Sequence, residues 1–156
     1  MNLTFLTADY PQGLCKKVLR NGESIPYPNI KNVSSIQYNV SPNKDGLAAF
    51  ESLLQKHAQA GDCLLKGNLK RELKNESRAG KTDRVSYTQL LVLDIDGLKL
   101  PGDSINKALT NKAVLNAAKQ VLQEFPIELQ NASFIAQASA SFGLRGEKVS
   151  LHIFFF

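Results

Sequence analysis

The sequence predicts an α+β domain, a sandwich in which helices pack on a sheet. Three observations support this fold class. The C-terminal half has the order strand, helix, strand, turn, strand, which is typical of helices covering one sheet. The N-terminal half contains an amphipathic helical pattern. The chain has 156 residues, 43% of them hydrophobic, which is enough to bury a core without disulfide or metal staples.

The N-terminal half is expected to contain two strands and one helix. Short apolar or alternating runs predict strands at residues 3–6 and 35–40. Apolar side chains then recur at helical spacing over residues 47–61, and Gly61 is a typical C-terminal stop. The segment 66–84 has few apolar anchors and several glycines and asparagines, so it is expected to be a broken helix or a long loop.

The C-terminal half begins with residues 85–95, which become almost continuously aliphatic and predict a buried central strand. A helix capped by Ser104 or Thr110 and ended by Pro126 should follow. Its core positions share a helical spacing: Val114, Leu115, Ala118, Val121, Leu122 and Phe125.

The last elements are a strand at residues 133–138, a polar turn at 143–148 and an apolar strand at 149–156. Three consecutive phenylalanines end the printed sequence. Exposed, they would favour association, so more protein is expected to follow.

Composition narrows the function classes. No apolar run approaches the roughly 20 residues that a membrane span needs, and the N-terminal stretch lacks the features of a signal peptide. Cys15 and Cys63 are too few for a disulfide scaffold and lack metal-site spacing. We therefore expect a cytoplasmic protein with no membrane partner and no cysteine-bound zinc.

The positive charge is concentrated in one stretch. The formal net charge is +5, and residues 66–84 hold seven bases and three acids, a net of +4. Such a stretch can hold the phosphates of a nucleic acid, and a solvated surface loop explains the same charges. The candidate nucleic-acid contacts are Lys70, Arg71, Lys74, Arg78, Lys81 and Arg84.

Asp94 and Asp96 end the aliphatic run, followed by Gly97. On a strand, residues two apart face the same side, so both carboxylates could converge on Mg²⁺ or Mn²⁺. Metal ions held in this way can assist phosphoryl or nucleotidyl transfer. Asp-Gly is also a common turn signal, and a simple hairpin toward residues 98–100 explains the same residues.

Ser150 and His152 share one face of the last predicted strand. An imidazole beside a hydroxyl could hold a phosphate or a ribose oxygen, although a lone strand histidine is commonly a hydrogen-bonded core residue. The small and polar lead-in adds three candidate nucleotide contacts: Ser141, Arg145 and Lys148. His57, within the N-terminal helix, is assigned a structural role.

Together these motifs resemble the archaeo-eukaryotic primase superfamily, the primase-polymerases, in the type found in phages and mobile elements. That family carries an hhhDhD strand, here residues 91–96, and then an S-x-H strand, here 150–152. The lead-in at 139–143 is similar to that of the phage versions. The resemblance covers roughly residues 85–156, and His152 follows Asp96 by 56 positions.

The resemblance implies an RRM-like catalytic sheet beside an N-terminal α/β unit, with residues 1–84 and 85–156 as two parts of one domain. It implies that Asp94 and Asp96 bind the catalytic Mg²⁺ or Mn²⁺. It further implies that His152 contacts the incoming nucleoside triphosphate and that Ser150 lies near its phosphates. The reaction would transfer nucleotides onto a 3′-hydroxyl, on a single-stranded DNA template, during replication of a phage, plasmid or other mobile element.

The resemblance has one departure. The family's third metal-binding aspartate follows the histidine strand, and no acidic residue follows His152 here. These residues are thus expected to be the N-terminal part of a longer primase-polymerase domain, and the isolated part could lack activity. A replicative helicase is a candidate partner.

Two other functions fit parts of the sequence. A haloacid-dehalogenase-type phosphatase also begins with an aliphatic strand ending in Asp-x-Asp-Gly, but it usually has threonine where this chain has Leu98. A non-catalytic nucleic-acid-binding module would use only the basic stretch 66–84.

Overall fold

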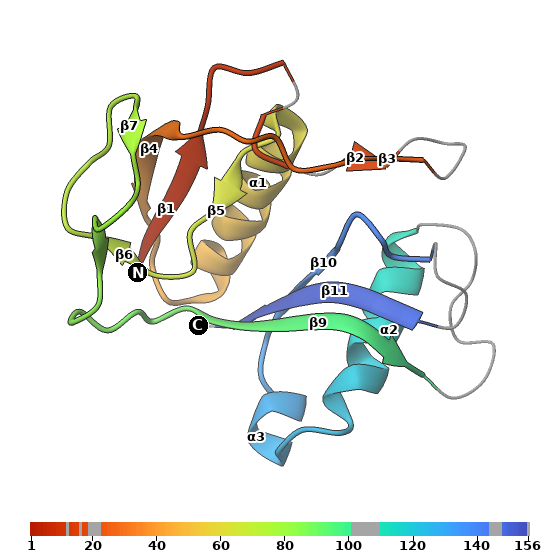
Figure 1. The fold of residues 1–156 in the computed structure, drawn as a ribbon. Coiled ribbons are helices and arrows are strands. Elements are labelled where there is room, and N and C mark those ends of the chain that lie inside the picture. Colours follow the sequence, from red (N-terminus) through yellow and green to blue (C-terminus); the bar gives the residue numbers. More distant parts are fainter. Residues whose placement is uncertain (12, 16, 19–22, 101–109, 144–147, 156) are drawn as a thin grey trace. The chain divides into compact units, whose positions relative to one another are not determined.

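The computed structural model has an α+β fold, as the sequence predicts (Figure 1). It describes residues 1–11, 13–15, 17–18, 23–100, 110–143 and 148–155. The chain divides into two compact units, an N-terminal unit that extends to Leu90 and a C-terminal unit that begins at Leu91.

The N-terminal unit contains one helix and eight strands among its described residues: β1 (Asn2–Thr7), β2 (Lys17–Val18), β3 (Ser24–Ile25), β4 (Asn32–Asn39), α1 (Lys44–Ala60), β5 (Cys63–Leu64), β6 (Asn68–Leu69), β7 (Glu76–Ser77) and β8 (Thr82–Asp83). Its main sheet has the order β5-β1-β4-β7, and two small ladders pair β2 with β3 and β6 with β8. The strands predicted at 3–6 and 35–40 are β1 and β4, which pair antiparallel.

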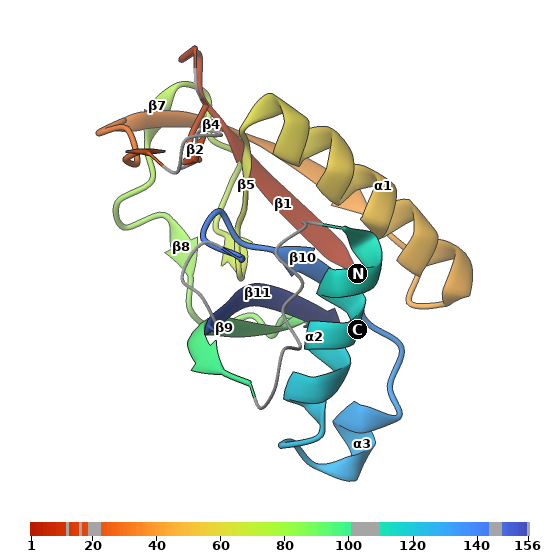
Figure 2. The same cartoon turned by 90° about the vertical axis from the view of Figure 1, so that its right-hand side faces the viewer.

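Helix α1 forms where helical spacing predicted it and runs along the sheet (Figure 2). The Asn43 side chain caps its N-terminus by accepting a hydrogen bond from the Gly46 N–H. Gly61 ends it with φ of 77°, a left-handed conformation that glycine adopts without strain. Phe50 and Leu54 on the buried face of α1 are almost inaccessible to solvent, so the helix is held by its apolar face.

The segment 66–84 does not form the broken helix that was one of its two expected forms. Its described backbone makes two short ladders, in which β6 pairs with β8 and β7 pairs with β4. Leu69 and Leu73 pack against Leu6 and Val33 in a small core, which anchors the segment to the main sheet. The helix prediction failed because the two anchoring leucines bind long-range partners instead of neighbours one turn away.

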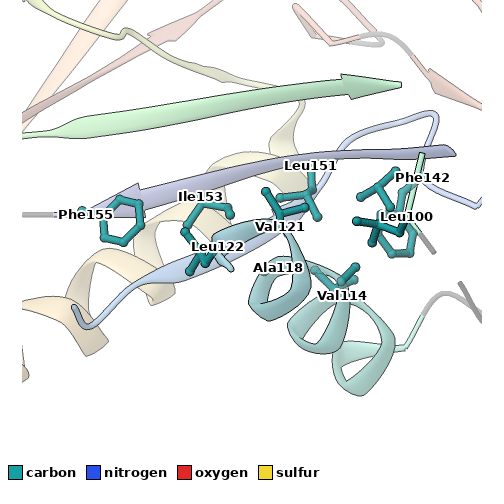
Figure 3. Packing of buried hydrophobic residues seen from close by; sticks show 11 residues of the cluster. Leu100, Val114, Ala118, Val121, Leu122, Phe142, Leu151, Ile153 and Phe155 are labelled. Atoms are coloured by element: carbon teal, nitrogen blue, oxygen red, sulfur yellow. The ribbon is translucent and has the colours of Figure 1, made fainter. Parts of the chain in front are cut away.

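The C-terminal unit is a three-stranded antiparallel sheet of order β10-β11-β9, with helices α2 and α3. The bounds are β9 (Leu91–Lys99), α2 (Asn111–Leu122), α3 (Ile127–Gln130), β10 (Ile135–Ala138) and β11 (Lys148–Phe155). Helix α2 packs on one face of the sheet, where Val121 and Leu122 meet Leu151 and Ile153 (Figure 3). The apolar closing strand is thus the central strand of its sheet.

The predicted strand at 85–95 needs two corrections. It starts only at Leu91, and in the described part of the chain it is an edge strand whose side chains are half-buried or exposed. Only Leu93 and Ile95 reach the core packed by α2. A continuous aliphatic run predicts burial on both faces, but Leu91 is 45% exposed.

Helix α2 is capped by Thr110, whose hydroxyl accepts a hydrogen bond from the Ala113 N–H, whereas Ser104 lies outside the described residues. Two details of its prediction were wrong. Leu115 is 43% exposed and is not a core residue. The helix ends at Leu122, and Pro126 is the N-cap of α3.

Candidate functional site

The two sequence motifs come into register on neighbouring strands. In the antiparallel pair of β9 and β11, Asp94 lies opposite His152 and Asp96 lies opposite Ser150. The alternate residues of both strands pack into the core beneath α2. Because side chains alternate along a strand, the four polar side chains share the sheet face opposite α2. We call this the polar face.

Asp94 and His152 are in direct contact. The Asp94 Oδ1 lies 3.2 Å from the His152 Nε2, and the two side chains are 56% and 30% exposed. This contact fixes the imidazole orientation while leaving the carboxylate open to solvent. A ligand on the polar face could therefore meet both groups.

Asp96 is held by Ser150. The buried Ser150 hydroxyl donates a hydrogen bond to the Asp96 Oδ1 over 2.9 Å and accepts one from the Gly97 N–H over 3.2 Å. Gly97 has φ of 71°, and the register of the two strands shifts there. Gly97 is thus the extra residue of a β-bulge. The hydroxyl therefore orients the Asp96 carboxylate, and the placement of Ser150 near nucleotide phosphates stays a prediction.

The Asp-Gly hairpin does not occur, because β9 continues to Lys99. The glycine of the Asp-Gly pair instead forms the bulge. Bulges re-aim side chains beside functional sites, and this one follows directly after Asp96.

The donor set fits Mg²⁺ or Mn²⁺ only in part. Among the described residues, no group of three or more His, Cys, Asp or Glu side chains is placed to hold a metal ion. Asp94 and Asp96 nevertheless lie two residues apart on one face of β9, and both are exposed. Mg²⁺ commonly uses one or two carboxylates and takes its other ligands from water and substrate phosphates. Asp94 and Asp96 could provide two carboxylates of this kind.

Gln137 belongs to the polar face, although sequence reasoning did not single it out. It lies on β10 directly opposite His152, while its neighbours Ala136 and Ala138 pack into the core. Asp94, His152 and Gln137 therefore form one row across three strands. The available signal was that Gln137 is the single polar residue of its strand. The sequence could not show which strand it would pair with.

The remaining predicted nucleotide contacts are placed differently. Lys148 is exposed at the start of β11, and its Cδ would lie 4.0 Å from a Cβ built on Gly97, so its side chain passes beside the bulge. The Ser141 hydroxyl lies 3.1 Å from that of Ser139, within the turn after β10. Arg145 lies outside the described residues.

Several bases of the segment 66–84 hold the segment itself together. Glu76 is paired with both Arg71 and Lys81, and these hydrogen bonds lower the pKa of Glu76 to about 2. Lys70 donates a hydrogen bond to the Gly80 carbonyl, and the Lys74 Nζ lies 3.9 Å from Glu72. The positive charge that this segment can offer to a polyanion is thus smaller than its number of lysines and arginines suggests. Arg78 and Arg84 are exposed.

A polar groove of about 480 Å³ lies within the N-terminal unit. It is formed by β1, β4, β6 and the chain that follows β8, and its wall includes Lys70 and Arg71. Tyr87, also in the wall, is 99% exposed, and Glu72 and Asp83 add negative charge. The groove therefore combines two cations, two anions and a free aromatic face.

The histidine of α1 and the two cysteines have structural surroundings. His57 is 3% exposed, lies 2.7 Å from Asp62 and 3.1 Å from the Tyr38 hydroxyl, and stacks on Phe5. The thiols of Cys15 and Cys63 are reduced, and their Sγ atoms are 3.8 Å apart. The hydrogen bond with Cys15, together with burial, raises the pKa of Cys63.

Within the described ranges, no helix has both the length and the apolar character required to cross a bilayer. Searches of protein-family models, of curated proteins and of solved structures found nothing similar to this chain.

Proposed function

We propose that this chain is a primase-polymerase-type nucleotidyltransferase domain that acts in replication of a phage, plasmid or other mobile element. The observation that carries the proposal is the pairing of the two motifs. Asp94 and Asp96 come from one motif, Ser150 and His152 from another, and they meet as cross-strand neighbours on the polar face. On an ordinary polar surface, there is no reason for the cross-strand pairs to join the residues of two motifs that also occur in the expected order.

Each residue receives a distinct role in this proposal. Asp94 and Asp96 hold Mg²⁺ or Mn²⁺, which when bound would neutralise the charge of the transferred phosphate. His152 lies on the neighbouring strand, is oriented by Asp94, and contacts the nucleoside triphosphate. Ser150 keeps the Asp96 carboxylate directed toward the polar face. Lys148 and Arg145 are proposed charge partners of the phosphates.

Nucleotide binding is the most direct test, because no acidic residue follows His152 in the sequence. The affinity for ATP and dATP in Mn²⁺ would be measured for the 156-residue chain and for Asp94→Asn, Asp96→Asn and His152→Ala. Loss of a metal ligand or of a charged contact should weaken binding about tenfold or more, equivalent to about 1.4 kcal/mol. Extension of a primed template by the same proteins would report catalysis.

The matched control is Glu124→Gln, which removes one exposed acid of the same unit away from the polar face. It should bind nucleotide as the original chain does. Unchanged binding in all three site variants would contradict the proposal. Vanadate-sensitive hydrolysis of a generic phosphate ester, lost in Asp94→Asn without any nucleotide binding, would favour the phosphatase alternative.

The groove of the N-terminal unit supports single-stranded DNA as a partner. Lys70 and Arg71 could contact phosphates by exchanging their present partners, the Gly80 carbonyl and Glu76. The exposed ring of Tyr87 can stack on a base. Of the six bases proposed from the sequence, these are the two that line the groove. The other four bases would act only through long-range electrostatic attraction of DNA: Lys74, Arg78, Lys81 and Arg84.

Salt dependence tests the groove. Lys70→Ala should lower the salt slope of DNA binding by about 0.7, the value for one phosphate contact on a single strand. Tyr87→Ala should weaken binding about fivefold or more without changing the slope, since stacking contributes roughly 1–3 kcal/mol per base. Lys112→Ala, an exposed charge on α2, is the control. Equal effects of all three substitutions would remove the groove from the proposal.

The cellular context follows from the same proposal. A primase-polymerase of this type would work in the cytoplasm of a bacterial or phage-infected cell, and a replicative helicase would be its natural partner. Co-sedimentation with a helicase of the same element would test that partnership, and the Lys112→Ala variant provides a folded reference.

A further inference from the structure

We propose that Gln137 is a sugar-binding residue, which hydrogen-bonds a ribose hydroxyl of the nucleotide held on the polar face. This inference rests on the proposed function and adds a third strand to its site. The observation behind it is the row that runs Asp94, His152, Gln137 across β9, β11 and β10.

The row changes in chemistry from one edge to the other. Asp94 is anionic and half-exposed, His152 can carry a positive charge, and Gln137 is neutral. Adjacent strands are about 4.8 Å apart, so the three side chains span roughly the distance between a phosphate and the far side of a sugar. With the phosphates placed at the carboxylate edge, the sugar falls toward β10.

An amide suits a sugar hydroxyl better than a phosphate. Gln137 offers two N–H donors and one carbonyl acceptor, so it can both donate to and accept from a hydroxyl group. Phosphates are more often held by arginine, lysine or backbone N–H groups. Within the described part of the chain, the half-buried Gln137 side chain makes no hydrogen bond, so its polar atoms are available to a ligand.

Ser139, the next residue along the chain on the same face as Gln137, is already engaged in another contact. The Ser139 hydroxyl lies 3.1 Å from that of Ser141 and accepts a hydrogen bond from the Ser141 N–H. It therefore belongs to the turn after β10. Gln137 is left as the polar side chain of β10 that can reach a ligand next to His152.

The experiment compares ATP with 2′,3′-dideoxy-ATP, both in Mn²⁺, as ligands of the 156-residue chain. The original chain should bind ATP about three- to tenfold more tightly, the effect of one or two hydrogen bonds. Gln137→Leu keeps the side-chain volume and should bind both nucleotides equally, at the affinity of the dideoxy form. 2′-Deoxy-ATP and 3′-deoxy-ATP then identify the hydroxyl.

The outcomes separate this inference from the proposed function. If neither nucleotide binds the original chain, the proposed function fails and the inference fails with it. If both bind and His152→Ala weakens both, but Gln137→Leu keeps the preference for ATP, only the inference is overturned. Gln123→Leu, at the exposed end of α2, should retain the preference and serves as the matched control.

Discussion

Replacing Ser150 with alanine should weaken the fold and the carboxylate site together. The Ser150 hydroxyl joins two groups that lie on another strand, the Asp96 carboxylate and the Gly97 N–H. Ser150→Ala removes both hydrogen bonds and leaves the N–H of the bulge without its partner. One substitution therefore probes the connection between the bulge and the proposed metal ligand.

The expected magnitudes follow from these two contacts. An unsatisfied, partly buried N–H costs about 1–3 kcal/mol, so the free energy of unfolding should fall by about 2 kcal/mol. Residues that orient metal ligands change metal affinity about 10–100-fold. Asp96 is exposed and water can replace part of the lost contact, so the affinity for Mn²⁺ should fall about tenfold.

Urea unfolding and Mn²⁺ titration would measure the two effects. A double-mutant cycle with Asp96→Asn then isolates the connection. If Ser150 acts on metal through Asp96, Ser150→Ala should change the remaining Mn²⁺ affinity of the Asp96→Asn protein by less than about twofold. Ser133→Ala, an exposed serine just before β10, should alter neither quantity.

Either of two results would contradict this role of Ser150. Ser150→Ala could unfold at the same urea concentration and bind Mn²⁺ as tightly as the original chain. Alternatively, the tenfold loss could persist undiminished in the Asp96→Asn background, which would place the effect of Ser150 outside the carboxylate.

Three further predictions concern stability and reactivity. Gly46→Ala should destabilise the chain by roughly 3 kcal/mol in urea unfolding, because its Cβ would lie 1.7 Å from the Ser41 carbonyl oxygen; a loss below about 0.5 kcal/mol would contradict this. The lowered pKa of Glu76, about 2 against an ordinary 4.5, predicts a stabilisation that is present above pH 4.5 and lost as the pH falls toward 2. Glu76→Gln should lack this loss, and a matching acid profile for both proteins would exclude the pairing. The raised pKa of Cys63 predicts slower alkylation by iodoacetamide in the native than in the urea-unfolded chain, and stability that falls as the pH rises above about 9, the ordinary value for this thiol. Equal alkylation rates would show that the thiol is not protected.

Local patterns predicted the elements whose stability depends on their own residues. The helix ending at Gly61 and the strands at 3–6 and 35–40 were found because period and capping act over a few neighbours. The segment 66–84 was predicted less well. Leu69 and Leu73 are buried against Leu6 and Val33, which lie about 35 to 70 positions away in the chain, and no local pattern encodes such partners.

The sequence by itself determined which side chains could do chemistry and which of them share a strand face. The alternation of side chains along a strand places Asp94 on the same face as Asp96, and Ser150 on the same face as His152, whichever strands they pair with. Only the tertiary structure decided that β9 and β11 pair in the register that brings these two sets together, that Gly97 forms a bulge instead of a turn, and that Gln137 completes the row. Pairing between strands depends on packing against α2 and on hydrogen bonds across more than 50 residues, whereas alternation depends only on the backbone of one strand.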